Sequence, residues 1–109
     1  MNASDRYQVH GAACMLDGQV LPVANLSVGG LFAVTDCPPM AGQVLNLQLA
    51  LPKQPPLPIT GQVTWVNDNG KRAHLPTGFG IKIMHISFVD KLTLLGYLRQ
   101  SYPTRRKLP

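Results

Sequence analysis

The clearest pattern in the sequence is the alternation of leucines with other residues between positions 44 and 51. Asn46 and Gln48 lie on one side of this stretch, and leucines occupy every second position on the other. These leucines are Leu45, Leu47, Leu49 and Leu51. Because successive side chains of a β-strand point to opposite faces, the alternation predicts a half-buried strand.

Further strands are predicted on both sides of this segment. They are expected at residues 6–16, 19–24, 31–35, 59–66 and 78–83. The first two are joined by Asp17-Gly18, which is typical of a two-residue hairpin turn. Residues 59–66 alternate like residues 44–51, so we expect these two strands to pair. Gly78 and Gly80 are expected to allow a tight strand crossing.

A single helix is predicted at the C-terminal end, from Ser87 to about Tyr102. Ser87 is a residue type that caps helix N-termini, and Asp90 places an acid in the first turn. The apolar face of this helix is expected to contain Val89, Leu92, Leu95 and Tyr102. The elements together predict a mainly β fold: a small antiparallel β-barrel of six or seven strands, plugged or flanked by a C-terminal α-helix.

Length and composition fit this architecture. A chain of 109 residues suits one domain, expected to span residues 1–109, with residues 1–5 as a flexible arm and residues 103–109 as a basic tail. Ten lysines and arginines against five aspartates, without any glutamate, give a net charge of +5 and favour an anionic partner. The sequence has no apolar leader and no run long enough to span a bilayer, so we expect a cytoplasmic protein without membrane insertion.

The candidate reactive groups do not form a recognisable catalytic or metal site. The histidines lack a neighbouring acid, and Ser27 is not in a nucleophile elbow, which argues against an enzyme. Cys14 and Cys37 are interpreted as buried structural thiols, and no metal or other cofactor is expected. The basic residues attract phosphates, but the aromatic residues fall mostly on core positions, so polymeric nucleic acid is not favoured as a partner.

The polar segment Asn25-Leu26-Ser27-Val28-Gly29-Gly30 is the strongest candidate for a binding site, and is called the 25–30 motif below. It offers an amide and a hydroxyl, and its paired glycines let the backbone bend sharply and approach a neighbour closely. The same residue types also serve ordinary chain reversal, so a plain turn of residues 25–30 is the alternative interpretation.

The order of these features resembles the PilZ domain, a bacterial module that acts as a receptor for cyclic di-GMP. The 25–30 motif matches the D/N-x-S-x-x-G turn of that family, and an apolar strand follows it at residues 31–35. Gly61-Gln62-Val63-Thr64-Trp65 matches the G-x-V-x-W strand, and Gly78-Phe79-Gly80-Ile81 matches the later G-x-G strand. The resemblance implies that Asn25 and Ser27 contact a guanine or its ribose phosphate, and that Gly29 and Gly30 let the ligand come close.

The second binding motif of that family, R-x-x-x-R, is incomplete in this chain. If Arg6 is the second arginine, Asn2 stands in the first place; if Arg6 is the first, His10 stands in the second. Either alignment leaves one guanidinium where the family has two. Arg6 is then expected to clamp a phosphate or stack on a base, with His10 as a further candidate.

The leading hypothesis is a stand-alone PilZ-like adaptor that binds cyclic di-GMP with weakened affinity and relays the signal to a protein partner. The alternative is a PilZ-fold interaction module that works without nucleotide, for instance in type IV pilus or motility machinery. The partner's identity and the oligomeric state do not follow from the sequence.

Overall fold

The computed structural model describes residues 6–68 and 75–101, which form seven strands and one helix. The strands are β1 (Tyr7–Gln8), β2 (Ala13–Leu16), β3 (Gln19–Leu26), β4 (Gly30–Val34), β5 (Val44–Ala50), β6 (Leu57–Asn67) and β7 (Gly78–Ile86), and the helix is α1 (Phe88–Ser101). The segments at 1–5 and 102–109, expected as an arm and a tail, lie outside the described residues.

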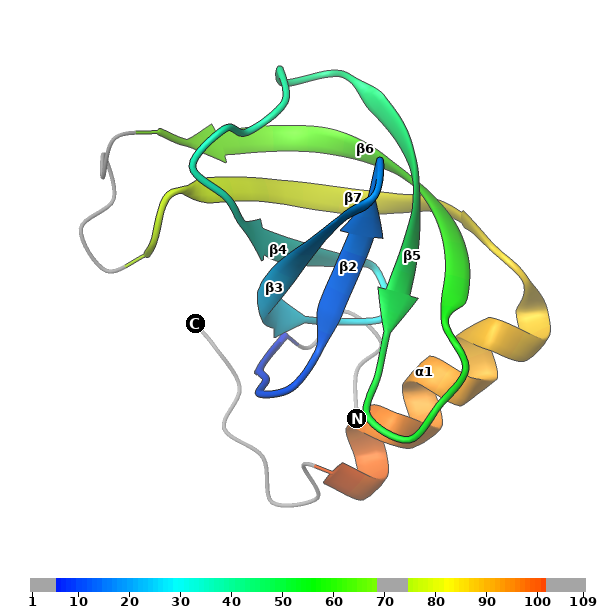
Figure 1. Ribbon diagram of the computed structural model, residues 1–109. Helices are drawn as coiled ribbons and strands as arrows, with labels where there is room; N and C mark the ends of the chain where they lie inside the picture. Colours follow the sequence, from blue (N-terminus) through cyan, green and yellow to red (C-terminus); the bar gives the residue numbers. More distant parts are fainter. Residues whose placement is uncertain (1–5, 69–74, 102–109) are drawn as a thin grey trace.

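Six of the strands close into an antiparallel barrel. The strand order is β1-β3-β2-β5-β6-β7-β4, and β4 pairs back onto β3 to complete the ring. The short strand β1 adds to the end of β3 as a seventh member (Figure 1). Closure gives the barrel strands partners on both sides over much of their length, and the predicted mainly β barrel with a C-terminal helix is confirmed.

The two alternating segments pair as predicted, and they supply one wall of the core. β5 and β6 run antiparallel, with Leu47 opposite Ile59 and Leu49 opposite Leu57. The four leucines of the alternating stretch are buried, while Asn46 and Gln48 on the other face are exposed. Period-two patterning therefore places each side chain correctly in this part of the barrel.

The N-terminal segment differs from the single strand predicted for residues 6–16. It forms two short strands, β1 and β2, separated by a bend in which Gly11 has a φ of +82°. The buried positions change parity across this bend, from Tyr7 and Val9 to Ala12 and Cys14, so no continuous alternation exists. The predicted hairpin turn at residues 17–18 is confirmed, since both of its residues have positive φ.

Two glycines of β7 make room for aromatic rings, as the tight-crossing interpretation expected. A Cβ on Gly80 would collide with the indole ring of Trp65, and a Cβ on Gly78 would collide with the carbonyl oxygen of Ala33. The Trp65 ring packs against Phe32, with ring centroids 5.2 Å apart. The aromatic pair thus occupies space that side chains on β7 would otherwise take.

The helix begins as predicted but packs through a different face. The Asp90 backbone N–H donates to the Ser87 hydroxyl at 3.1 Å, which confirms the N-cap. The fully buried residues are Leu94 and Leu98, and Leu95 of the expected face packs partly buried against the core. The expectation was wrong for two other residues, because Val89 is 69% and Leu92 is 51% exposed. Tyr102 lies outside the described residues.

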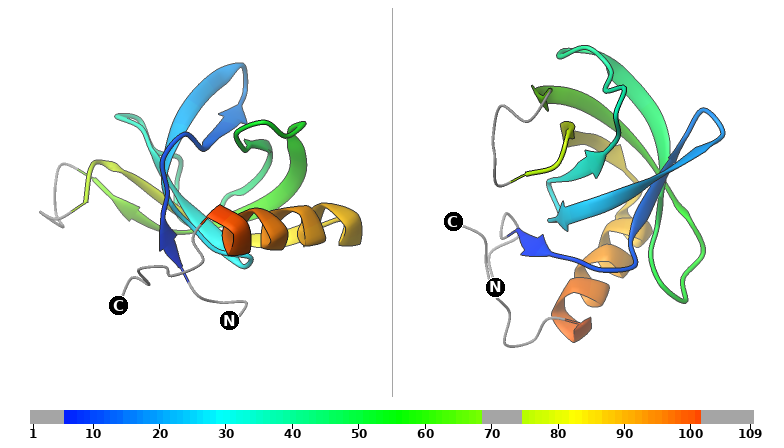
Figure 2. Two further views of the ribbon diagram at one scale, coloured as in Figure 1. Left: turned by 90° about the horizontal axis from the view of Figure 1, so that it is seen from below. Right: turned by 60° about the vertical axis from the view of Figure 1, so that its left-hand side comes forward.

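Phe88 is an exception to the expectation that the aromatic residues lie mostly at core positions, because it is 75% exposed. Apolar residues occupy more than one side of α1, so the sequence pattern does not determine which side meets the barrel. Figure 2 shows α1 lying alongside one end of the barrel, where Leu94 and Leu98 join the core.

Candidate functional site

The 25–30 motif forms a tighter connection than a six-residue turn. Asn25 and Leu26 are the last residues of β3, and Gly30 is the first residue of β4. Leu26 pairs with Leu31 across the two strands. Three residues, 27–29, therefore make the reversal, and the expectation that the whole motif is a turn is corrected in that respect.

The Ser27 hydroxyl holds this reversal together. Its oxygen accepts hydrogen bonds from the backbone N–H groups of Gly29 at 3.2 Å and Gly30 at 3.0 Å, and its proton is donated to the Gly30 carbonyl at 3.3 Å. The Ser27 N–H also donates to that carbonyl at 2.8 Å. A hydroxyl has one donor and two acceptor positions, so the turn uses all of them.

The two glycines of the motif lie against β7. The Ile83 N–H donates to the Gly29 carbonyl at 2.8 Å, which ties the reversal to the neighbouring strand. Gly30 pairs with Lys82, and a Cβ at Gly30 would collide with the backbone carbonyl oxygen of Ile81. Glycine at position 30 is therefore required by this close approach of two backbones, whether or not a ligand binds.

Arg6 lies directly over the motif. Its Nη1 donates to the Asn25 side-chain oxygen at 3.1 Å, and its Nη2 lies 3.5 Å from the place where a Cβ of Gly30 would stand. Asn25 is itself buried, and burial lowers the pKa of the Arg6 guanidinium. A guanidinium stays protonated in proteins and carries five N–H donors, so Arg6 keeps a positive charge and further donors beside the motif.

His10 does not share this position. Gln8 pairs with Asn25, and the Val9 N–H donates to the Ala24 carbonyl at 3.2 Å, so each step beyond β1 moves away from the reversal at residues 27–29. His10 follows as an exposed residue in the bend. The structure thus brings Arg6, but not His10, together with the 25–30 motif, and Asn2 lies outside the described residues.

A hollow of about 410 Å³ opens beside the motif. It is lined by Val28 and Gly29, by the end of β7 at residues 83–86, and by Lys91 of α1. Lys91 is exposed and adds a second cation close to the motif. Sequence reasoning did not select Lys91, because its proximity to the motif arises only when α1 folds back along the barrel.

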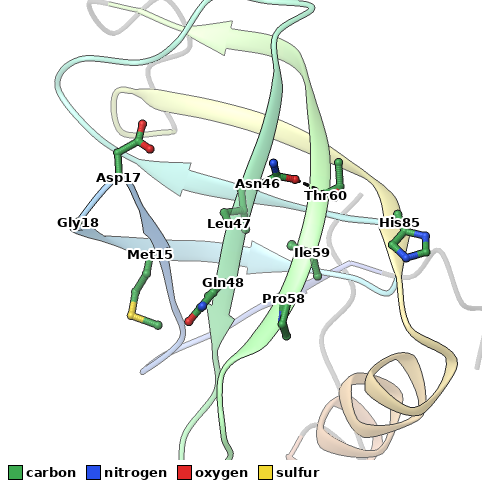
Figure 3. Close-up of a pocket in the computed structure, with 10 residues that line it drawn as sticks. All are labelled: Met15, Asp17, Gly18, Asn46, Leu47, Gln48, Pro58, Ile59, Thr60 and His85. Carbon is green, nitrogen blue, oxygen red and sulfur yellow. Dashed lines mark hydrogen bonds between the residues drawn. The ribbon is translucent and has the colours of Figure 1, made fainter.

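A second hollow, of about 600 Å³, lies on the outer face of the barrel (Figure 3). Its walls include Asn46, Gln48, Thr60 and His85, and the Thr60 hydroxyl donates to the Asn46 side-chain oxygen at 3.0 Å. Asp17 adds a carboxyl group to its lining. This hollow shares no residue with the 25–30 motif and suits an anionic ligand less well than the surroundings of Arg6.

Within residues 6–68 and 75–101, no three His, Cys, Asp or Glu side chains gather to hold a metal ion. Both cysteines are free thiols; Cys14 is buried as expected, whereas the expectation that Cys37 is buried was wrong, because Cys37 is exposed. In the same part of the chain, no helix is both long and apolar enough to cross a membrane.

Comparison with known proteins identifies the class of domain. A family model described as the PilZ domain matches residues 2–100. No curated protein matches the chain.

Two solved structures share the fold. The Bacillus subtilis inhibitor of motility, MotI/DgrA, superposes with a TM-score of 0.72 at 20% identity, over 94% of this chain and 52% of its own. The Borreliella burgdorferi PlzA protein, solved in complex with c-di-GMP, gives a TM-score of 0.55 at 12% identity, over 89% of this chain and 40% of its own. This chain therefore spans about half the length of the first protein and less of the second.

Proposed function

This chain belongs to the PilZ domain family, and on that basis we propose that it is a cyclic di-GMP-binding adaptor that relays the signal to a protein partner. Its fold is related to that of PlzA, whose structure holds c-di-GMP. The proposed role is binding rather than catalysis, with cyclic di-GMP as a ligand and not as a cofactor of a reaction.

The observation that carries this proposal is the contact between Arg6 and the 25–30 motif. The guanidinium donates to Asn25 at 3.1 Å, and its other donors lie beside a glycine that has no side chain to block a ligand. A planar guanidinium fork matches both a phosphate and the acceptor edge of guanine. Arg6 and the motif therefore combine a charge, a hydrogen-bonding fork and a close backbone approach.

The proposed affinity is weaker than two arginines would give. The position of Arg6 just before β1, bonded to Asn25, favours it as the second arginine of the R-x-x-x-R motif, which leaves Asn2 in the first place. Loss of one charge-assisted contact costs about 1.5 to 3 kcal/mol, or roughly 10 to 150-fold in affinity. Lys91, across the hollow, is a cation that can attract a phosphate in compensation.

The proposed transmission of the signal to a partner follows from the two segments of the chain that the ligand would connect. A nucleotide bonded to Arg6 and to the 25–30 motif links the chain just before β1 to the β3–β4 connection. The surface that a protein partner meets there then differs between the free and bound states. The protein partner therefore detects the ligand through a change in the surface that it contacts, and no chemical reaction is involved.

A second function is favoured by the hydrogen bonds within the motif. The Ser27 hydroxyl is fully used by the reversal, and the Asn25 oxygen is already bonded to Arg6. A motif satisfied in this way is also what a nucleotide-independent interaction module would contain. Such a module would dock on its partner, for instance in type IV pilus or motility machinery, in the same way with or without ligand.

Titration of the protein with cyclic di-GMP, followed by partner capture with and without the nucleotide, separates the two functions. The adaptor requires heat of binding and a partner whose capture changes with cyclic di-GMP. Absence of heat up to high micromolar ligand, together with capture that ignores the nucleotide, favours the second function.

A further inference from the structure

The helix α1 has a second apolar side that the barrel does not cover. Leu94 and Leu98 face the core, while Phe88, Val89 and Leu92 are 75%, 69% and 51% exposed. At about 100° per residue, Phe88 and Leu92 lie about 40° apart, on a different side of the helix from Leu94 and Leu98. A helix that is apolar on two sides is typical of one that is covered on both.

A groove runs beside this exposed side. It is a hollow of about 580 Å³ between α1 and the β5–β6 loop, lined by Lys53 of the loop and by Leu92, Gly96 and Tyr97 of the helix, among others. Figure 1 shows the loop reaching down alongside α1. A Cβ placed on Gly96 would meet no heavy atom within 4 Å, so the floor of the groove has room for a side chain from outside.

The charges around the groove have one sign. Lys53 lies on its loop wall, and Arg99 is exposed on α1, about 60° around the helix from Gly96. Asp90 lies about 120° around the helix from Gly96, and no aspartate is among the described residues that line the groove. The surface is therefore apolar with a basic rim, which complements an acidic partner and opposes a second copy of itself.

We propose that this groove, together with Phe88, Val89 and Leu92, docks an acidic amphipathic segment of a partner protein. The inference rests on the proposed adaptor function, for which it supplies the partner surface. Apolar side chains of the segment fill the space over Gly96 and pack on Leu92, and its carboxylates meet Lys53 and Arg99. Burial of the exposed apolar residues provides the binding free energy, and the cations select the partner's charge.

The helix that carries the docking surface also borders the proposed nucleotide site, because Lys91 of α1 lines the hollow that contains Val28 and Gly29 of the 25–30 motif. A nucleotide phosphate drawn to Lys91 lowers the positive potential along α1 that attracts the acidic segment, so ligand and partner are coupled through the charge of the helix. Cyclic di-GMP is expected to weaken binding of the acidic segment.

The test is selection from a displayed library of random peptides against the wild-type chain, with a Gly96→Glu variant for counter-selection. The glutamate fills the groove and adds a negative charge at its floor. Gly96→Ala is the matched control, because it leaves most of the space open and alanine favours the helix. Both variants are first checked for an unchanged melting transition and an unchanged cyclic di-GMP isotherm.

The expected result is a set of peptides that combine aspartate or glutamate with leucine or phenylalanine. Their affinity should fall by about tenfold or more in Gly96→Glu and stay within about twofold in Gly96→Ala. Failure to enrich such peptides, or equal binding of the selected and the scrambled acidic peptide, overturns the proposal.

Two further arms test other occupants of the groove. Binding to vesicles of phosphatidylcholine and phosphatidylglycerol that Gly96→Glu abolishes, without peptide binding, would assign the surface to lipid. Self-association in sedimentation that the same variant abolishes would assign it to a second copy. Either result contradicts the docking proposal, while cyclic di-GMP titration of the same samples reports separately on the nucleotide function.

Discussion

The Arg6 guanidinium donates to the Asn25 side-chain oxygen at 3.1 Å. This bond joins two sequence motifs that are 19 residues apart, at the point where β1 adds to the end of β3. It holds a half-buried cation against a buried carboxamide, so the arginine is positioned before any ligand arrives. Preorganisation of this kind reduces the ordering cost of binding and offsets part of the loss of the second arginine.

Restoring the second arginine should reveal which alignment of the R-x-x-x-R motif applies. Asn2→Arg is expected to tighten cyclic di-GMP binding by roughly 10 to 150-fold, the effect of one charge-assisted contact. His10→Arg is the matched control and should change the affinity little, since His10 lies beyond β1. Isothermal titration of both variants measures the difference, and a gain confined to His10→Arg would show that the alignment is reversed.

Ser27→Ala should destabilise the protein even without ligand. The substitution removes the acceptor for two backbone N–H groups and is expected to cost about 1 to 3 kcal/mol in the free energy of unfolding. Thr35→Ala is the control, because its hydroxyl accepts from the Cys37 N–H at an exposed site where water can replace it. Urea unfolding of the two variants should separate them, and equal losses would argue against a structural role for Ser27.

Gly80→Ala should displace the single tryptophan. The added Cβ would collide with the Trp65 indole, and overpacking of this kind costs about 1 to 3 kcal/mol. We expect a lower melting temperature together with a shift of the tryptophan emission. Gly96→Ala adds a methyl group in open space and should be neutral or stabilising, so a similar loss in both variants would contradict the packing described.

The buried thiol of Cys14 should make stability depend on pH in the alkaline range. Burial raises the pKa of Cys14 from 9.0 to about 11, so the folded state keeps its proton where the unfolded state loses it. The stabilisation is full below pH 9 and is lost as the pH rises towards 11, by about 2 to 3 kcal/mol in total.

Unfolding measured between pH 8 and 11 in wild type and Cys14→Ala tests this linkage. The difference in unfolding free energy between the two proteins should shrink as the pH rises. A difference that stays constant across this range would contradict the raised pKa. At pH 8 the exposed Cys37 should react with iodoacetamide long before Cys14 does.

The alternating stretches were predictable because each strand of the β5–β6 pair is half-buried along most of its length. Residues 6–16 were not, since a glycine with positive φ changes the buried parity between Val9 and Ala12. The prediction of the buried face of α1 was wrong for a different reason. Val89 and Leu92 are as apolar as Leu94 and Leu98, and only the packing of α1 on the barrel decides which of them are buried.

The candidate site shows the same division between local and tertiary information. Asn25, Ser27 and Gly30 could be selected because their residue types and spacing are local. To predict that the Ser27 hydroxyl makes all of its hydrogen bonds within its own turn, one would need the positions of the Gly29 and Gly30 amides. That Arg6 rather than His10 meets the motif depends on the register of β1 on β3, and the proximity of Lys91 depends on the path of α1.

Isothermal titration with cyclic di-GMP of the wild-type chain beside Arg6→Ala tests the central claim most directly. Lys53→Ala, which removes one positive charge that does not line the hollow beside the 25–30 motif, is the control for net charge. The account predicts measurable heat for wild type and for Lys53→Ala, with affinity lower by roughly 10 to 150-fold in Arg6→Ala. Equal affinities in wild type and Arg6→Ala, or no heat from the wild-type chain up to high micromolar ligand, would contradict it.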